Sequence, residues 1–183
     1  VYKRQEFAKK QGIKVFYYIS PKVWVWKEKR VFKIKKWVDK MFVIFPFEVD
    51  FYKKFDYDSF YTGNPLLDEI SNYTPSTDFI QKNNLSDKPI IGVLPGSRKQ
   101  EVTGFLQDML TIVKEYPNHQ FVIGGVNNLS SSFYEPFIDN EQISVVYEQT
   151  YDLLSHSKVA LVASGTATLE TALFNIPQVV CYR

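Results

Sequence analysis

The 183-residue sequence contains few of the residues that build disulfide, zinc and membrane-spanning structures. Its one cysteine, Cys181, excludes an internal disulfide and is typical of a reducing compartment such as the cytosol. Its two histidines, His119 and His156, lack partners at the spacing of a zinc site, so we expect no metal ion. The longest apolar run, 41–47, is interrupted by Pro46 and falls well short of the roughly 20 residues that span a bilayer.

Hydrophobic residues nevertheless make up 45% of the sequence, which is ordinary for a protein with a buried core, and the charge is unevenly divided. Residues 1–60 contain 15 Lys and Arg against 7 Asp and Glu, whereas residues 61–183 contain 7 against 13. This division indicates that the first part of the chain faces an anionic partner, whether a membrane, a nucleic acid or another polyanion.

Apolar runs alternate with helical patterns along the chain. Strands are predicted at 15–19, 41–45, 59–63, 89–94, 119–125, 143–148, 158–164 and 178–182. Helices are predicted at 28–39, 48–55, 76–84, 98–116, 130–138, 150–156 and 165–174. Strands separated by helices predict an α/β fold with doubly wound parallel sheets.

A stretch rich in turn-forming residues, 64–79, separates three predicted strands from five. We therefore expect the second part of one Rossmann-like domain at 1–63, a connection at 64–86, and the first part of another such domain at 87–183. Because neither set of strands ends clearly, we expect both sheets to be incomplete.

The turn "LPGSRKQEV" follows the apolar run "PIIGV" and is a candidate anion site. Pro95 and Gly96 favour a sharp exit from the strand, and Ser97 is placed to cap the helix that follows. Arg98 then lies in the first turn, where a helix carries a partial positive charge and cations are usually avoided. An anion held there would explain the arginine. Alternatively, this is an ordinary turn in which Arg98 is solvated or paired with Glu101.

A second turn of this kind, "ASGTATLE", follows the run "VALV". Ser164 and Gly165 form the turn, Ser164 or Thr166 is placed to cap the helix, and Glu170 lies in its early turns. Two such turns from one sheet could converge on a nucleotide diphosphate, since pyrophosphate needs several N–H donors. Two ordinary capped turns are the alternative. The sequence has no GxGxxG, GxxxxGK[S/T] or GxSxG motif.

The helix predicted over 28–39 has an apolar side for the core and a basic side opposite. The apolar side consists of Val31, Ile34 and Val38. The basic side consists of Lys29, Lys33, Lys36 and Lys40, flanked by Phe32 and Trp37. This pattern is that of a helix resting on an anionic membrane surface, or of an ordinary solvated face.

Three residues near this helix also attract attention. Trp24 and Trp26 precede it, and alternation predicts that they point the same way, into a pocket or an interface. Glu48, in "FPFE", lies at a predicted helix start, where a carboxylate is stabilised by the helix dipole. We favour this capping role over a catalytic one.

Together these motifs resemble the lipid-A-disaccharide synthase family. The resemblance is carried, in order, by "YISPKVWVWKEKRVFKIKKWVDKMFVIFPFE", "FYKKF", "YTGNPLLD", "LPGSRKQEV" and "ASGTATLETAL". It implies a GT-B fold, in which two Rossmann-like domains face each other across a cleft. It also implies an inverting glycosyltransferase that joins UDP-2,3-diacylglucosamine to 2,3-diacylglucosamine 1-phosphate (lipid X) in lipid A biosynthesis, without a cofactor or a nucleic-acid partner.

The resemblance further implies roles for the residues quoted above. The UDP side would include Gly96, Ser97, Arg98, Glu101, Ser164, Gly165, Thr166 and Glu170. The acceptor and membrane side would include Trp24, Trp26, Lys29, Lys33, Lys36, Trp37 and Lys40. The implied location is cytoplasmic, peripheral to the anionic cytoplasmic face of the inner membrane.

The sequence departs from the family pattern in ways that limit these expectations. Asn64 stands where the family usually has histidine. The family's presumed catalytic base is expected upstream of Val1, so we expect an internal fragment that does not form the disaccharide alone. A non-catalytic nucleotide- or lipid-binding module, or another GT-B enzyme such as a UDP-GlcNAc epimerase, stays as an alternative.

Overall fold

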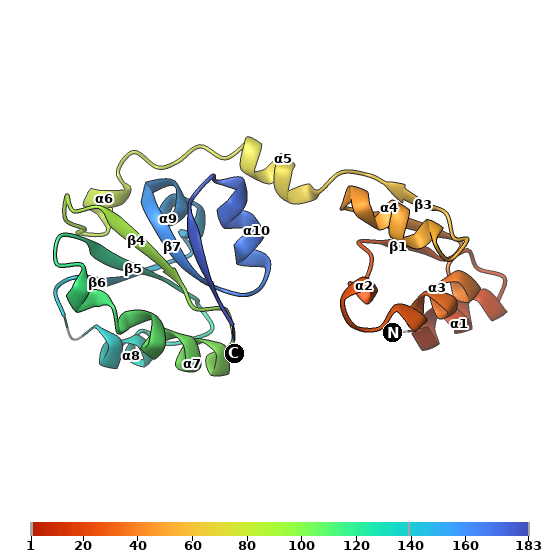
Figure 1. The fold of residues 1–183 in the computed structure, drawn as a ribbon, viewed down its shortest axis with the longest axis horizontal. Helices are drawn as coiled ribbons and strands as arrows, with labels where there is room; N and C mark the ends of the chain where they lie inside the picture. The colour runs from red at the N-terminus through yellow and green to blue at the C-terminus, as the bar shows by residue number, and fades with distance from the viewer. Residues whose placement is uncertain (1, 139, 183) are drawn as a thin grey trace. The chain divides into compact units, whose positions relative to one another are not determined.

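The computed structural model describes residues 2–138 and 140–182. The chain divides into two compact units, Val1–Glu69 and Ile70–Arg183, which we describe separately (Figure 1). Each unit contains one parallel sheet, so the predicted α/β class is confirmed.

The first unit contains a three-stranded parallel sheet in the order β1-β2-β3. Its strands are β1 (Phe16–Tyr18), β2 (Lys40–Val43) and β3 (Ser59–Tyr61). Its helices are α1 (Tyr2–Lys10), α2 (Val23–Trp26), the 3₁₀ turn η1 (Glu28–Arg30), α3 (Val31–Trp37) and α4 (Pro46–Lys53). Helix α5 (Pro65–Ser71) follows β3.

The core of the first unit lies on one face of its sheet. Val31, Ile34 and Val38 are buried there against Met41 and Val43, as the spacing of the apolar residues predicted. The other face carries a row of aromatic side chains that includes Phe16, Tyr18 and Phe60, each about half exposed. Alternation along a strand explains this division, because successive side chains point to opposite faces.

The second unit contains a five-stranded parallel sheet in the order β6-β5-β4-β7-β8. Its strands are β4 (Ile90–Leu94), β5 (Gln120–Gly125), β6 (Ile143–Tyr147), β7 (Ser157–Ala163) and β8 (Gln178–Cys181). Its helices are α6 (Phe79–Lys82), α7 (Lys99–Leu110), α8 (Ser131–Tyr134), α9 (Thr150–His156) and α10 (Thr166–Leu173), with 3₁₀ turns η2 (Val113–Glu115) and η3 (Glu135–Phe137).

This sheet is buried on both faces, as a doubly wound fold requires. On one face Val93 and Phe121 pack with Leu106 of α7. On the other face Val122 and Val162 pack with residues of α6 and α9. Figure 1 shows α7 and α8 on one side of the sheet and α6, α9 and α10 on the other. Continuous apolar strands such as β4, in which all five residues are buried, follow from this two-sided burial.

All eight predicted strands are found, three in the first unit and five in the second. The helix predicted over 28–39 is shorter than expected, because it begins as η1 and α3 ends at Trp37. Lys40 is therefore the first residue of β2 and does not lie on the helix with the other lysines, which corrects the prediction. Its ammonium group lies 5.5 Å from the centre of the Phe60 ring instead.

The doubly wound core of the second unit leads to a stability prediction. Leu106→Ala removes a fully buried side chain between α7 and the sheet, so we expect the free energy of unfolding to fall by about 2–5 kcal/mol. The neighbouring Gln107→Ala, on the exposed side of α7, is the control and should change it by less than about 0.5 kcal/mol. Urea denaturation measures both, and equal effects would place Leu106 outside the core.

Candidate functional site

The strand order of the second unit places two turns at one edge of its sheet. From β4 the chain moves outward to β5 and β6, then crosses back to β7 on the other side of β4. This reversal makes the gap between β4 and β7 the switch point, where ligands of open α/β sheets bind. Leu94 pairs with Val162, so the turns after the two strands leave the sheet side by side. These are the "LPGSR" and "ASGT" turns singled out in the sequence.

The first turn is closed by a carboxylate. Gly96 has a φ of +107°, a conformation that L side chains rarely adopt. The Glu101 carboxylate accepts hydrogen bonds from the backbone N–H groups of Ser97 (3.4 Å) and Arg98 (3.3 Å). It also forms a 2.9 Å ion pair with the Arg98 guanidinium group, which is 83% exposed. Arg98 thus pairs with Glu101, and the binding of an anion at this turn stays a prediction.

This arrangement corrects the predicted capping of helix α7. Arg98 is itself the N-cap residue, with an extended backbone, and Ser97 lies one position before the cap. The capping atom comes from Glu101 three residues into the helix, as in one half of a capping box. The Glu101 carboxylate therefore occupies the position that an external anion would take at this helix end.

The pKa of Glu101 responds to two opposing influences. Its partial burial raises the pKa, but the N–H groups of Arg98 and Ser97 and the charge of Arg98 together hold it below its usual range. The carboxylate is accordingly charged at neutral pH and stabilises the start of α7.

The second turn differs from the first in how the helix that follows it is capped. Gly165 is the N-cap residue of α10, its backbone is extended, and no side chain caps this end within the part of the chain that the structure describes. The prediction that Ser164 or Thr166 caps the helix is therefore wrong, although both lie exposed at the turn. Glu170 lies further along α10, where the Tyr151 hydroxyl donates to it at 3.4 Å.

A third turn at the same edge was missed in the sequence. Asn128 follows β5, and its side-chain N–H donates to the Ser97 carbonyl at 3.2 Å. This bond ties the turn after β5 to the turn after β4. The signal that would have found it is its place just after a predicted strand, because carboxyl ends of neighbouring parallel strands share an edge.

In the first unit, a buried carboxylate lies at the corresponding edge. Glu48 is 1% exposed and accepts a hydrogen bond from the Phe45 N–H at 3.1 Å, which confirms its predicted capping of a helix. Its other oxygen accepts from the Ser20 hydroxyl (2.5 Å) and the Trp24 indole N–H (3.2 Å). Glu48 thereby fixes the segment after β1 to the turn after β2.

The hydrogen bond between Trp24 and Glu48 corrects the prediction for the two tryptophans. Trp24 and Trp26 lie in the short helix α2 and not in an extended loop, so they do not point the same way. Trp24 is half-buried over Glu48, whereas Trp26 is 85% exposed. Of the other residues predicted on this side, Lys29, Lys33 and Lys36 are exposed, and the Lys36 ammonium group lies 4.7 Å from the centre of the Trp37 ring.

Asn64 has a local structural role. Its side-chain oxygen accepts a hydrogen bond from the Leu66 N–H at 3.1 Å, at the start of α5, and the residue is buried. This is the bond that an asparagine makes when it caps a helix.

The family profile described as Lipid-A-disaccharide synthetase matches residues 3–183. The chain belongs to this family. A Lipid-A-disaccharide synthase of Coxiella burnetii is 38% identical to it over 181 residues, covering 96% of this chain and 48% of the relative. The chain thus spans about half the length of the curated relatives it matches.

Solved structures share the fold at much lower sequence identity. The S. aureus protein MnaA, solved with UDP, matches with a TM-score of 0.68 and 14% identity, over 97% of this chain and 53% of that one. A UDP-GlcNAc 2-epimerase from Neisseria meningitidis, bound to UDP-GlcNAc, matches with a TM-score of 0.58 and 17% identity, over 96% and 54%. These likenesses bear out the GT-B type of fold, and at such identity they show the fold alone.

Metal-binding clusters and membrane-spanning helices are both absent from the described residues. No cluster of three or more His, Cys, Asp or Glu residues that could hold a metal ion occurs among them. None of the helices built from them is both long and apolar enough to cross a membrane.

The Glu101 cap leads to a prediction about pH. Because the folded state holds the pKa of Glu101 below its unfolded value, the stability it contributes is present above the unfolded pKa, about 4.3, and is lost as pH falls through the folded pKa. Between about pH 6 and pH 3, the wild-type protein should therefore lose more stability than Glu101→Gln. Urea denaturation at each pH measures this difference.

A matched control is Glu115→Gln, an exposed glutamate of the same unit. It should keep the wild-type pH dependence. If Glu101→Gln keeps it as well, Glu101 does not cap α7 in solution.

Proposed function

We propose that this chain contributes to an inverting glycosyltransferase that joins UDP-2,3-diacylglucosamine to 2,3-diacylglucosamine 1-phosphate, releasing UDP. The observation that carries the proposal is the family match along residues 3–183. The two turns at the switch point of the second unit support it, because they lie where a nucleotide binds in open α/β sheets.

The second unit is proposed to hold the diphosphate of the donor. Arg98 supplies a guanidinium group, which binds phosphate oxygens with two parallel hydrogen bonds. Gly96 lets the backbone approach closely, and the uncapped start of α10 at Gly165 and Thr166 faces the same edge. In the transition state, negative charge develops on the departing diphosphate, and these donors stabilise it without a metal ion.

Binding of the diphosphate involves an exchange of partners at Arg98. In the structure, Glu101 takes up the Ser97 N–H, the Arg98 N–H and the guanidinium group. A diphosphate that binds these donors displaces the carboxylate. Because the Glu101 side chain is 36% exposed, it can turn into solvent when this happens.

The general base is not assigned to a residue of this chain. Glu48 is the carboxylate best placed at the edge of the first sheet, but three hydrogen bonds already bind its two oxygens. A base must have a lone pair within reach of the attacking hydroxyl group. We therefore give Glu48 a structural role.

The proposal is tested in a chimera in which residues 3–183 replace the matching stretch of the Coxiella burnetii relative. With both diacylated substrates, the chimera should form the disaccharide, detected by mass spectrometry. Arg98→Ala should weaken UDP binding by about 1.5–3 kcal/mol, the size of a charge-assisted hydrogen bond, and should reduce disaccharide formation. Calorimetry measures the affinity for UDP.

Two outcomes would count against the proposal. A chimera that binds UDP but forms no disaccharide favours the non-catalytic binding module. Unchanged UDP affinity in Arg98→Ala removes Arg98 from the site. Gln100→Ala, which changes an exposed residue of α7, is the control and should keep both binding and activity.

The first unit is proposed to face an anionic membrane surface through Lys29, Lys33 and Lys36. All three are exposed, on the side of η1 and α3 away from buried Val31 and Ile34. The substrates are acylated, so an enzyme acting on them must reach the membrane surface where such molecules reside. Lysines near an anionic surface each contribute roughly 1 kcal/mol of attraction.

Replacing Lys29, Lys33 and Lys36 with Gln should therefore weaken binding to vesicles of phosphatidylcholine with phosphatidylglycerol by roughly 3 kcal/mol. A vesicle sedimentation assay measures this. The control replaces Lys14, Lys53 and Lys54, which are exposed elsewhere in the same unit, with Gln. If both triple variants lose binding equally, only net charge matters and the lysine face has no specific role.

A further inference from the structure

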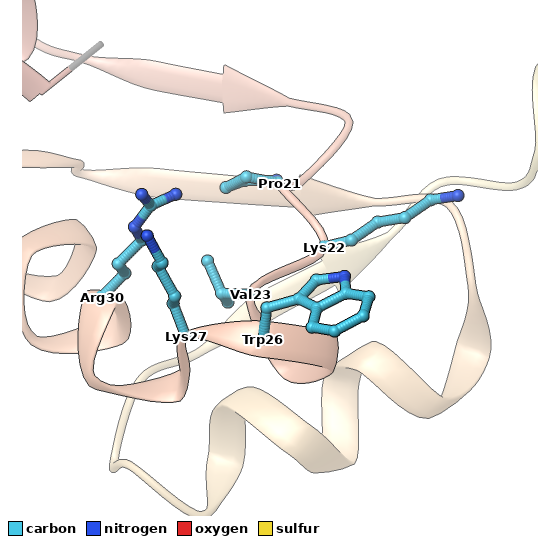
Figure 2. A pocket seen from close by; sticks show the side chains of 6 residues that line it. All are labelled: Pro21, Lys22, Val23, Trp26, Lys27 and Arg30. Carbon is cyan, nitrogen blue, oxygen red and sulfur yellow. The ribbon is translucent and has the colours of Figure 1, made fainter. Parts of the chain in front are cut away.

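A small pocket in the first unit lies beside the exposed Trp26. It has a volume of about 270 Å³ and is lined by Pro21, Lys22, Val23, Trp26, Lys27 and Arg30 (Figure 2). This volume is slightly below the usual range for drug-sized ligands, about 300–1,000 Å³, so the pocket suits a single polar headgroup.

Three of the residues that line the pocket, Lys22, Lys27 and Arg30, are cations. Figure 2 shows Lys27 and Arg30 rising side by side from one wall, with Lys22 extending away from them. Within residues 2–138 and 140–182, no carboxylate forms an ion pair with any of these three cations. Two like charges that share one wall repel each other, and an anion between them relieves the repulsion. A guanidinium group beside an ammonium group is well suited to phosphate.

The remaining walls are apolar and firmly held. Val23 is 3% exposed, and Val31, directly after Arg30, is fully buried, so both ends of the segment are anchored in the core. Glu48 binds Ser20 and Trp24 on either side of Pro21 and Val23. The indole of Trp26 is left exposed beside the cations, where it offers a flat apolar surface to a ligand.

We propose that this pocket binds the phosphate of the phosphorylated acceptor sugar, with Lys27 and Arg30 contacting the phosphate and Trp26 covering one face of the sugar. This proposal rests on the proposed function, which supplies an acceptor that carries a phosphate monoester. The pocket follows the carboxyl end of β1, the edge at which ligands of parallel sheets bind. Glu48 acts as a positioning residue, because it holds the segment that forms the pocket.

An anionic lipid headgroup is the other source of phosphate, and the geometry favours the sugar phosphate. The pocket is a half-open hollow with room for one small group. Lys36 lies along α3 outside it, and Lys33 lines a second hollow that shares Lys27 and Arg30 with the first, so these two lysines face the more extended surface. The fork of Arg30 also matches the several free oxygens of a monoester better than those of a phosphodiester.

The test uses the 183-residue chain and glucosamine 1-phosphate, a soluble probe with the acceptor's headgroup chemistry. Calorimetry should detect binding of this probe and no comparable binding of glucosamine. Lys27→Gln and Arg30→Gln should each weaken binding about tenfold or more, and Arg30→Lys should weaken it less, because it keeps the charge and loses the fork. Lys53→Gln and Arg4→Gln, both at exposed positions outside the pocket, are the matched controls and should bind normally.

Several results would overturn the proposal. These are unchanged affinity in both pocket variants, equal binding of glucosamine, or loss of vesicle binding in Arg30→Gln without any effect on glucosamine 1-phosphate. The last result would assign the pocket to a membrane lipid. Folding of each variant is checked by circular dichroism, and since Lys27 and Arg30 are exposed, no core contact is removed.

The outcome is separable from that of the proposed function. The pocket assignment alone fails if UDP binds through Arg98 and the chimera makes disaccharide, but the affinity for glucosamine 1-phosphate is unchanged in the Lys27 and Arg30 variants. If glucosamine 1-phosphate binds as expected while the chimera makes no disaccharide, the pocket stands as a sugar-phosphate site and the proposed function fails.

Discussion

The pairing of β4 with β7 is the constraint on which the second unit depends. β4 is buried along its whole length, and β7 lies beside it although three helices and two strands separate them in the sequence. Because the chain reverses its direction of winding between these two strands, their turns meet without a covering crossover. The place of the candidate site therefore follows from strand order, and the residues of the turns would decide which ligand it binds.

The sequence was sufficient to predict most of this architecture. Strands buried on both faces appear as continuous apolar runs, which is why the strands at 90–94 and 157–163 could be located within a residue or two. Glycine in a strand-to-helix turn, as at Gly96, also carries a local conformational signal. The sequence alone did not show whether the two turns converge, because strands that are neighbours in a sheet need not be consecutive in the sequence.

Details set by tertiary contacts could not be predicted in the same way. The cap of α7 comes from Glu101 and not from Ser97, because a carboxylate can satisfy two N–H groups and a guanidinium group together. Trp24 turned inward because Glu48 accepts its indole N–H, which broke the expected alternation with Trp26. Lys40 joined the sheet because α3 ended before it.

The cations of the two candidate sites differ in whether a carboxylate pairs with them, and this difference affects how strongly an anion would bind at each site. Arg98 is paired with Glu101, so on the proposed function a diphosphate exchanges places with this carboxylate, and its binding free energy is only the difference between the two interactions. Lys27 and Arg30 pair with no carboxylate among the described residues, so an anion that reaches them gains attraction without displacing a partner. On the proposed assignments, a monoester therefore needs few contacts to bind the first unit. The donor must form enough contacts with both turns to exceed what Glu101 already supplies, which favours a diphosphate over a single phosphate there.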